Sequence, residues 1–186
     1  MAHLLQEEAI QIIKAGFIPA DRNFYFSICG YSMSPMLYPG AKVMVSTQVE
    51  PKRIFIGDIV VITYPHCSNA VAHRVIFVRK RNGESFFLTK GDGNRSFDQV
   101  VGSDQILGKV VAIQKENRLI NLSQTSWRVA GIFIAAISGI CGLLHRLIGR
   151  YSIFCGRVGS KVGLCFGRIF FLIYRIFLRA VVVSLS

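Results

Sequence analysis

The chain has 186 residues, of which 52% are hydrophobic and 17% are charged, and its formal net charge is +12. This length fits one domain with an appendage, and such an apolar composition indicates contact with a membrane. The charge is uneven, because residues 123–186 contain eight Lys or Arg residues and no Asp or Glu. A segment that is both basic and apolar fits anionic lipid, and this argues against nucleic acid as the partner.

Residues 1–22 carry apolar side chains at helical spacing, and Gly16 and Pro19 follow them. The spacing predicts a short amphipathic N-terminal helix that ends near Gly16. Five charged side chains lie in this segment and no long apolar run does, so no secretory signal peptide is expected. Without an export signal, the rest of the chain is expected by default on the cytoplasmic side of a membrane.

Residues 23–122 carry the pattern of an all-β domain. Short runs rich in β-branched and aromatic residues predict strands at 24–28, 43–47, 59–64, 71–78, 86–89 and 106–113. Turn residues separate these runs, at Pro39-Gly40, Gly57-Asp58, Asn82-Gly83 and 91–94. The pair Asn82-Gly83 between two strand-like runs predicts a hairpin. We expect a compact barrel or folded sheet of about 100 residues.

Residues 123–186 predict a helical tail that associates with a membrane, and 123–126 is the expected junction and helix N-cap. The uncharged run 129–144 is shorter than the roughly 20 residues that a membrane span needs. The second apolar stretch, 164–183, is interrupted by Arg168, Arg175 and Arg179. Arginine at membrane depth is costly, so a pair of spanning helices is the alternative rather than the first expectation.

The basic residues of the tail share one side of a helix. At about 100° per residue they fall within a sector of about 60°, and they are Arg128, Arg146, Arg150, Arg157, Lys161, Arg168, Arg175 and Arg179. We expect this sector to face lipid phosphates while the helix lies along the membrane surface. A neighbouring stripe of glycines at a seven-residue interval predicts close helix packing; it comprises Gly142, Gly149, Gly156 and Gly163.

Residues able to perform acyl transfer lie in separate segments of the β-domain. Ser32 follows a predicted strand and a glycine, His73 lies in a strand-like run, and Asp92 and Asp98 follow a later strand. A serine nucleophile needs a base to take its proton and a carboxylate to orient that base. A serine in a tight bend also turns backbone N–H groups toward one point, as an oxyanion hole requires. No metal and no organic cofactor is expected for this chemistry.

The segments around these residues resemble, in order, the type I signal peptidase family of serine endopeptidases. The resemblance covers about residues 24–115 and is carried by short boxes: Ser-Met-x-Pro-x-Leu at 32–37, Pro39-Gly40, Gly-Asp-Ile-Val at 57–60, His-Arg-Val at 73–75, Thr-Lys-Gly-Asp-x-Asn at 89–94 and Leu-Gly-Lys-Val at 107–110. His73 stands where most bacterial members have a lysine base, and this resembles the endoplasmic-reticulum and archaeal branch, which has a second Asp six residues after the first. Asp98 stands at that distance from Asp92.

The resemblance implies a fold shared with LexA-type peptidases and a role for each residue. Ser32 would attack the scissile carbonyl, His73 would act as general base, and the backbone N–H of Ser32 would hold the oxyanion. Asp98 would orient the imidazole, while Asp92 would support its loop or share that role. The substrate would be a signal or precursor peptide cut after small residues.

This sequence departs from the family in two ways. Gly30 stands where many members have a serine that helps the oxyanion. Residues 1–22 have no long apolar run like the N-terminal anchor usual in the family, so the basic tail is expected to replace that anchor. Two other functions stay open. A LexA-like regulatory domain, tethered to the membrane, would cleave itself or be inactive, although such proteins use a lysine base. A pure binding module would only dock on anionic membrane.

Overall fold

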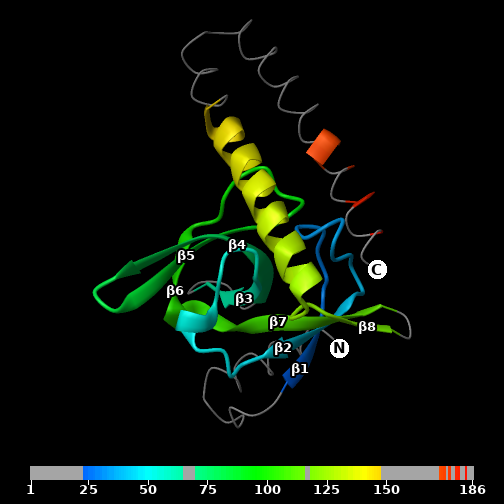
Figure 1. Ribbon diagram of the computed structural model, residues 1–186, viewed down its shortest axis with the longest axis horizontal. Coiled ribbons are helices and arrows are strands. Elements are labelled where there is room, and N and C mark those ends of the chain that lie inside the picture. Colours follow the sequence, from blue (N-terminus) through cyan, green and yellow to red (C-terminus); the bar gives the residue numbers. More distant parts are fainter. Residues whose placement is uncertain are drawn as a thin grey trace, which may run out of the picture.

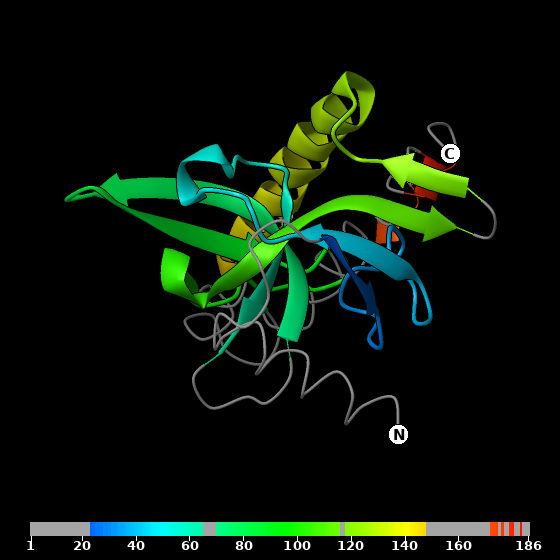
Figure 2. The same cartoon turned by 90° about the horizontal axis from the view of Figure 1, so that it is seen from below.

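The computed structural model describes residues 23–64, 70–115, 118–147, 172–174, 176, 179–180 and 183, and its described part is mainly β (Figures 1 and 2). The strands are β1 (Asn23–Ser27), β2 (Lys42–Ser46), β3 (Ile59–Thr63), β4 (Ala70–Arg81), β5 (Glu84–Lys90), β6 (Val100–Gly102), β7 (Ile106–Lys115) and β8 (Arg118–Asn121). Two short 3-10 helices, η1 (Pro51–Arg53) and η2 (Ser103–Gln105), precede β3 and β7, and one long helix covers Thr125–Leu147. The helix expected in residues 1–22 lies outside the described residues.

The strands form one antiparallel sheet in the order β1-β2-β7-β3-β4-β5-β6, with β8 paired to β7. The pairing registers shift within β2–β7, β3–β7 and β4–β5. Such bulges bend strands and increase their twist, and the sheet accordingly curls into a half-barrel (Figure 2). The β4–β5 hairpin projects from one side, and the long helix crosses over the sheet (Figure 1).

All six predicted strands are present, and the hairpin turn has the predicted chemistry. Asn82 and Gly83 both have positive φ, at 51° and 82°, and they join Arg81 to its cross-strand partner Glu84. A two-residue hairpin turn needs this left-handed backbone, which Asn and Gly adopt at the lowest cost. The strands β6 and β8 were not predicted, because runs of three and four residues are too short to show a period.

The core lies on both faces of the sheet, which is why β3 is buried along its whole length. On one face Val61 packs in a cluster with Trp127 of the long helix. On the other face Val60 packs with Phe87 of β5. A strand that is covered on both faces has no need of alternating polar residues, and β3 has the sequence Ile-Val-Val-Ile-Thr. The helix is therefore part of the packing of the β-domain.

Two expectations about the tail concern this long helix. Among the described residues it is the one helix long and apolar enough, by length and composition, to cross a membrane; it has 23 residues, not the sixteen of the uncharged run. It begins at Thr125, inside the predicted junction. Gly142 packs against Phe97 of the β-domain, since a Cβ at Gly142 would lie 2.6 Å from the Phe97 Cζ, and packing of the glycine stripe on another helix stays a prediction.

The basic sector is only partly described. Arg128, Arg146 and Arg179 are exposed. The remaining members of the sector and of the glycine stripe lie outside the described residues: Arg150, Arg157, Lys161, Arg168, Arg175, Gly149, Gly156 and Gly163. The choice between an in-plane and a spanning arrangement of that region stays a prediction.

Candidate active site

Ser32 lies in a tight turn that follows β1, and glycines of a distant loop hold this turn in place. The N–H of Gly93 donates to the Ser32 carbonyl oxygen at 2.7 Å. A Cβ at Gly93 would lie 2.7 Å from the Tyr31 carbonyl oxygen, and a Cβ at Gly91 would clash with the Ser32 carbonyl oxygen. Only glycine permits this approach of two backbones. The backbone of the Gly-Asp-Gly-Asn loop at 91–94 therefore packs directly on the backbone of the turn that carries Ser32.

His73 and Asp98 form a hydrogen-bonded pair. His73 lies in β4, opposite Val60 of β3, and is buried. Its Nδ1 is 2.5 Å from Oδ2 of Asp98, which comes from the loop after β5. Thr89 fixes Asp98 at two points, because its hydroxyl donates to the carboxylate Oδ2 at 2.8 Å and its backbone carbonyl accepts the Asp98 backbone N–H at 2.9 Å. Asp98, and not Asp92, is thus the carboxylate that orients the imidazole.

The pair leaves the second nitrogen of the ring available. An ionised carboxylate only accepts hydrogen bonds, so Nδ1 of a neutral His73 carries the proton and Nε2 has the free lone pair. Nε2 is buried and has no hydrogen-bond partner among the described residues. A buried acceptor without a partner costs free energy, and it is the atom that a general base uses. This geometry matches that of a base awaiting a proton donor.

Asp92 forms a buried ion pair with Arg74 and does not contact His73 in this structure. Nε and Nη2 of Arg74 donate to Oδ1 and Oδ2 of Asp92 at 2.8 and 2.7 Å. Nη1 donates to the Gly57 carbonyl at 2.7 Å. Burial opposes the charge on Arg74, but the attraction and hydrogen bonds of Asp92 outweigh it and raise the pKa of the guanidinium. Arg74 therefore stays charged and connects β4 to the Asp92 loop and to the turn at Gly57.

The hairpin β4–β5 separates these two polar groups because side chains alternate between the faces of a strand. Arg74 lies opposite Lys90, and Val75 lies opposite Thr89. His73 and Thr89 consequently meet Asp98 on one face, while Arg74 and Lys90 project from the other. One face of this pair of strands thus presents His73 to Asp98, and the other face presents Arg74 and Lys90.

Lys90 connects that second face to the long helix. It is buried, and its Nζ donates to the hydroxyl of Ser138 in the helix at 2.8 Å. The same Nζ is 5.7 Å from the centre of the Tyr174 ring. Burial lowers the pKa of Lys90, and the charge of Asp92 opposes that shift. Sequence analysis missed this contact, because nothing in the chain pairs Lys90 with a serine 48 residues away.

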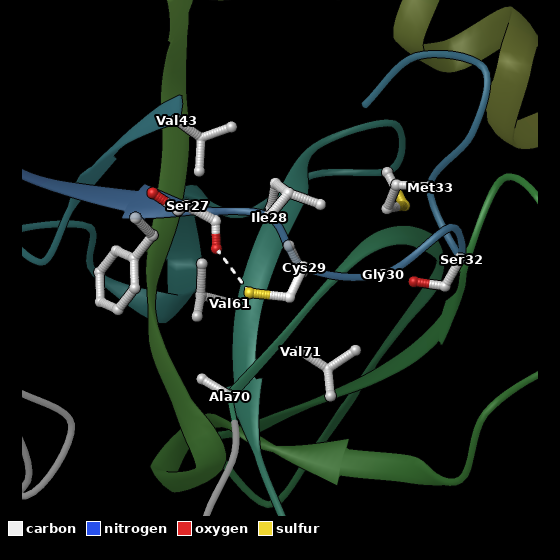
Figure 3. Close-up of a pocket in the computed structure, with 12 residues that line it drawn as sticks. Ser27, Ile28, Cys29, Gly30, Ser32, Met33, Val43, Val61, Ala70 and Val71 are labelled. Atoms are coloured by element: carbon white, nitrogen blue, oxygen red, sulfur yellow. Dashed lines mark hydrogen bonds between the residues drawn. The ribbon is translucent and has the colours of Figure 1, made fainter. Parts of the chain in front are cut away.

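A pocket of about 210 Å³ extends from Ser32 along β1 (Figure 3). Ser32 stands at one end, beyond Cys29 and Gly30, and the two residues that precede His73 also line the pocket. The lining is mostly apolar and consists of Phe26, Ser27, Ile28, Cys29, Gly30, Ser32, Met33, Val43, Val61, Ala70, Val71 and Ala72.

The predicted residues are brought together unequally. His73 meets Asp98, and the Ser32 turn meets the loop that carries both aspartates, but the unpartnered Nε2 shows that Ser32 and His73 are not hydrogen-bonded in this structure. Catalytic hydrogen bonds of a free enzyme often form only when substrate is bound. At Gly30 a side chain would meet no atom within 4 Å, so a serine would fit there.

Comparisons with known proteins leave the family of this chain open. No family model matches the sequence, and no curated protein matches it. The function is therefore argued from the site itself.

Proposed function

We propose that this chain is a membrane-associated serine endopeptidase, similar to signal peptidases, that cleaves signal or precursor peptides. Ser32 is the nucleophile, His73 the base that takes its proton, and Asp98 the carboxylate that orients the base. The backbone N–H of Ser32 binds the oxyanion. The observation that carries the proposal is the buried His73–Asp98 pair, whose remaining ring nitrogen has no partner.

The pocket beside Ser32 supports a peptide as the substrate. β1 is at the edge of the described sheet, and the chain that follows it lines the pocket. An extended peptide can add to an edge strand and place alternate side chains in a pocket. Two small side chains, Ala70 and Ala72, leave room on the β4 side. This arrangement favours an extended apolar segment with its scissile carbonyl at Ser32.

The reaction uses only groups of the chain. Ser32 Oγ forms a bond to the scissile carbonyl carbon as His73 Nε2 takes the hydroxyl proton, and the resulting imidazolium is stabilised by Asp98. His73 then returns the proton to the leaving amine. Water hydrolyses the acyl-enzyme by the same transfers in reverse. Asp92 and Arg74 take no proton; their ion pair fixes to β4 the loop whose Gly93 N–H binds the Ser32 carbonyl.

Membrane association is the second part of this proposal, with anionic lipid as the partner and the cytoplasmic leaflet as the default face. It is supported by the helix Thr125–Leu147 and by the eight basic residues of 123–186.

Mass spectrometry of peptides from cells that express the wild-type chain or Ser32→Ala tests the proposal. We expect a set of new peptide termini that depend on Ser32, whereas Ser96→Ala, at an exposed serine of the loop before Asp98, should leave them unchanged. Cleavage of this chain alone, without other products, would support a self-cleaving regulatory domain. Identical termini in both cultures would reject a peptidase.

A further inference from the structure

The helix Thr125–Leu147 has two apolar faces. Trp127, Ile134, Ser138 and Cys141 lie on its inner face and are buried against the β-domain. The opposite side exposes a row of large apolar side chains, each with 38–63% of its surface accessible: Val129, Ile132, Phe133, Ile140, Leu143, Leu144 and Leu147. At about 100° per residue this row, here called the outer face, occupies a sector of about 120°.

The outer face lacks the polar residues of a helix that faces water. A surface helix usually carries charged or polar side chains opposite its buried stripe, and a helix that is apolar all round is covered on all sides. Between Arg128 and His145 the one polar side chain is that of Ser138, which faces inward and binds Lys90. The uncharged run 129–144 is about 24 Å long at 1.5 Å per residue. A cover of matching apolar character is therefore required.

The apolar surface of the outer face continues onto the β-domain at the N-terminal end of the helix. Phe55 and Ile56 are exposed in the turn before β3, and Gly57 of this turn touches the helix at Gly131. The guanidinium of Arg128 lies 5.9 Å from the centre of the Phe55 ring. The apolar surface is thus formed by two segments of the fold that pack on each other.

The charges around the outer face distinguish between the partners that could cover it. Arg128 and Arg146 are exposed at its two ends, and residues 123–186 contain no acidic residue. A second copy of the chain would bring the same basic residues into contact and meet like-charge repulsion. An anionic lipid surface instead offers hydrocarbon to the outer face and phosphates to its arginines.

We infer that the outer face, together with Phe55 and Ile56, docks in the plane of an anionic bilayer. This inference rests on the membrane association proposed above and names the surface that makes it. The helix does not cross the bilayer, because its inner face is fixed to the β-domain at Gly131, at Ser138 and at Gly142. Crossing would carry the buried Lys90 and the polar ends of the strands into hydrocarbon, where unsatisfied polar groups are not tolerated.

Binding of the full chain to vesicles of phosphatidylcholine and phosphatidylglycerol tests this surface. The variant Phe133→Gln, Ile140→Gln, Leu143→Gln removes three side chains of the outer face. The matched control is Tyr25→Gln, Phe77→Gln, Val100→Gln, which removes three exposed apolar side chains from the sheet. We expect the helix variant to lose about 100-fold or more in vesicle partitioning, and the control to bind like the wild type. Equal binding of both variants would overturn the inference.

Depth measurements distinguish an in-plane helix from a spanning one. Single tryptophans at Val129→Trp, Ile140→Trp or Leu147→Trp, each with Trp127→Phe, are quenched by lipids brominated at shallow or deep positions. An in-plane helix gives the same shallow quenching at all three sites. Deep quenching at residue 140 with shallow quenching at the two ends would show a span. Thermal unfolding of each variant verifies that it is folded before quenching is read.

Two further outcomes have distinct meanings. If the wild type is a dimer without lipid and the helix variant is a monomer, a second copy covers the outer face and the inference is wrong. If the wild type does not bind vesicles at all, membrane association fails, and the inference fails with it. The peptidase proposal is tested separately, by Ser32-dependent cleavage, and survives either result.

Discussion

The substitutions Asp92→Asn and Asp98→Asn separate folding from catalysis. Asp92 is fully buried and accepts two hydrogen bonds from Arg74, at 2.8 and 2.7 Å. Replacing it with Asn leaves the Arg74 guanidinium buried without a counter-charge and turns an amide donor toward its N–H groups. Breaking a buried pair from one side costs about 3–5 kcal/mol of unfolding free energy. We expect the thermal midpoint to fall by about 10 °C or more.

Asp98→Asn should act on rate instead. The side chain of Asp98 is partly exposed, and an Asn oxygen can still accept the Thr89 hydroxyl bond of 2.8 Å. His73 Nδ1 contacts that same Oδ2, so an Asn whose oxygen stays there loses the negative charge that stabilises the imidazolium, while an Asn whose NH2 turns there loses the Thr89 bond and places the ring proton on the wrong nitrogen. The corresponding change in serine proteases lowers kcat by about 10⁴. We expect a loss of about 10³–10⁴ in kcat with a midpoint shift of a few degrees.

Thermal unfolding and single-turnover cleavage of both variants test the assignment. Asp104→Asn is the matched control, because Asp104 is exposed in η2 and its neutralisation should change stability by no more than about 0.5 kcal/mol. The assignment is wrong if Asp98→Asn lowers the midpoint more than Asp92→Asn does, or if Asp92→Asn alone removes cleavage in a folded protein. Either result would exchange the roles of the two carboxylates.

Three further predictions concern the nucleophile, the buried lysine and the helix contact. Ser32→Ala and His73→Ala should each lower cleavage by orders of magnitude, and the double variant should be little worse, because the two act as one unit; near wild-type cleavage by His73→Ala would remove it as the base. Burial lowers the pKa of Lys90, so between its folded pKa and the unfolded value of about 10.4 only the unfolded chain holds the proton. The free energy of unfolding should therefore rise with pH in that range and be lost as pH falls through the folded pKa. Denaturant unfolding at several pH values should show a weaker pH dependence of the unfolding free energy for Lys90→Met than for the wild type. Equal pH dependence of the two proteins would contradict the buried environment of Lys90. Gly142→Ala should destabilise by about 1–3 kcal/mol, because its Cβ overlaps Phe97; unchanged thermal unfolding would show that the helix does not hold this loop.

The strands of this fold follow from local sequence, and their curl does not. The Asn82-Gly83 turn sets the β4–β5 register because these two residues favour left-handed backbone. The bulge between Val75 and Phe77 depends on partners elsewhere in the sheet, and no local signal marks it. The short strand β6 also needs its partner β5 to be recognised.

The sequence predicted which residues form the candidate site, while the contacts between these residues required the structure. Spacing alone left open which carboxylate meets His73, since Asp92 and Asp98 lie in one loop. Strand alternation explains why His73 and Arg74, which are neighbours, face opposite ways and have different partners. The coordinates then show that His73 meets Asp98 and Arg74 meets Asp92. The contact between Lys90 and Ser138 could not be predicted, because it joins a strand to a helix with no charge on the helix side.

The central claim is that Ser32 is a nucleophile activated by His73. Its most direct test is reaction of the full chain with a serine-directed electrophilic peptide, followed by mass spectrometry of the digested protein. We predict one covalent adduct, on Ser32, formed by the wild type and by Ser96→Ala, and lost in His73→Ala. An adduct on another serine, or a Ser32 adduct that forms equally fast without the His73 imidazole, would contradict the account.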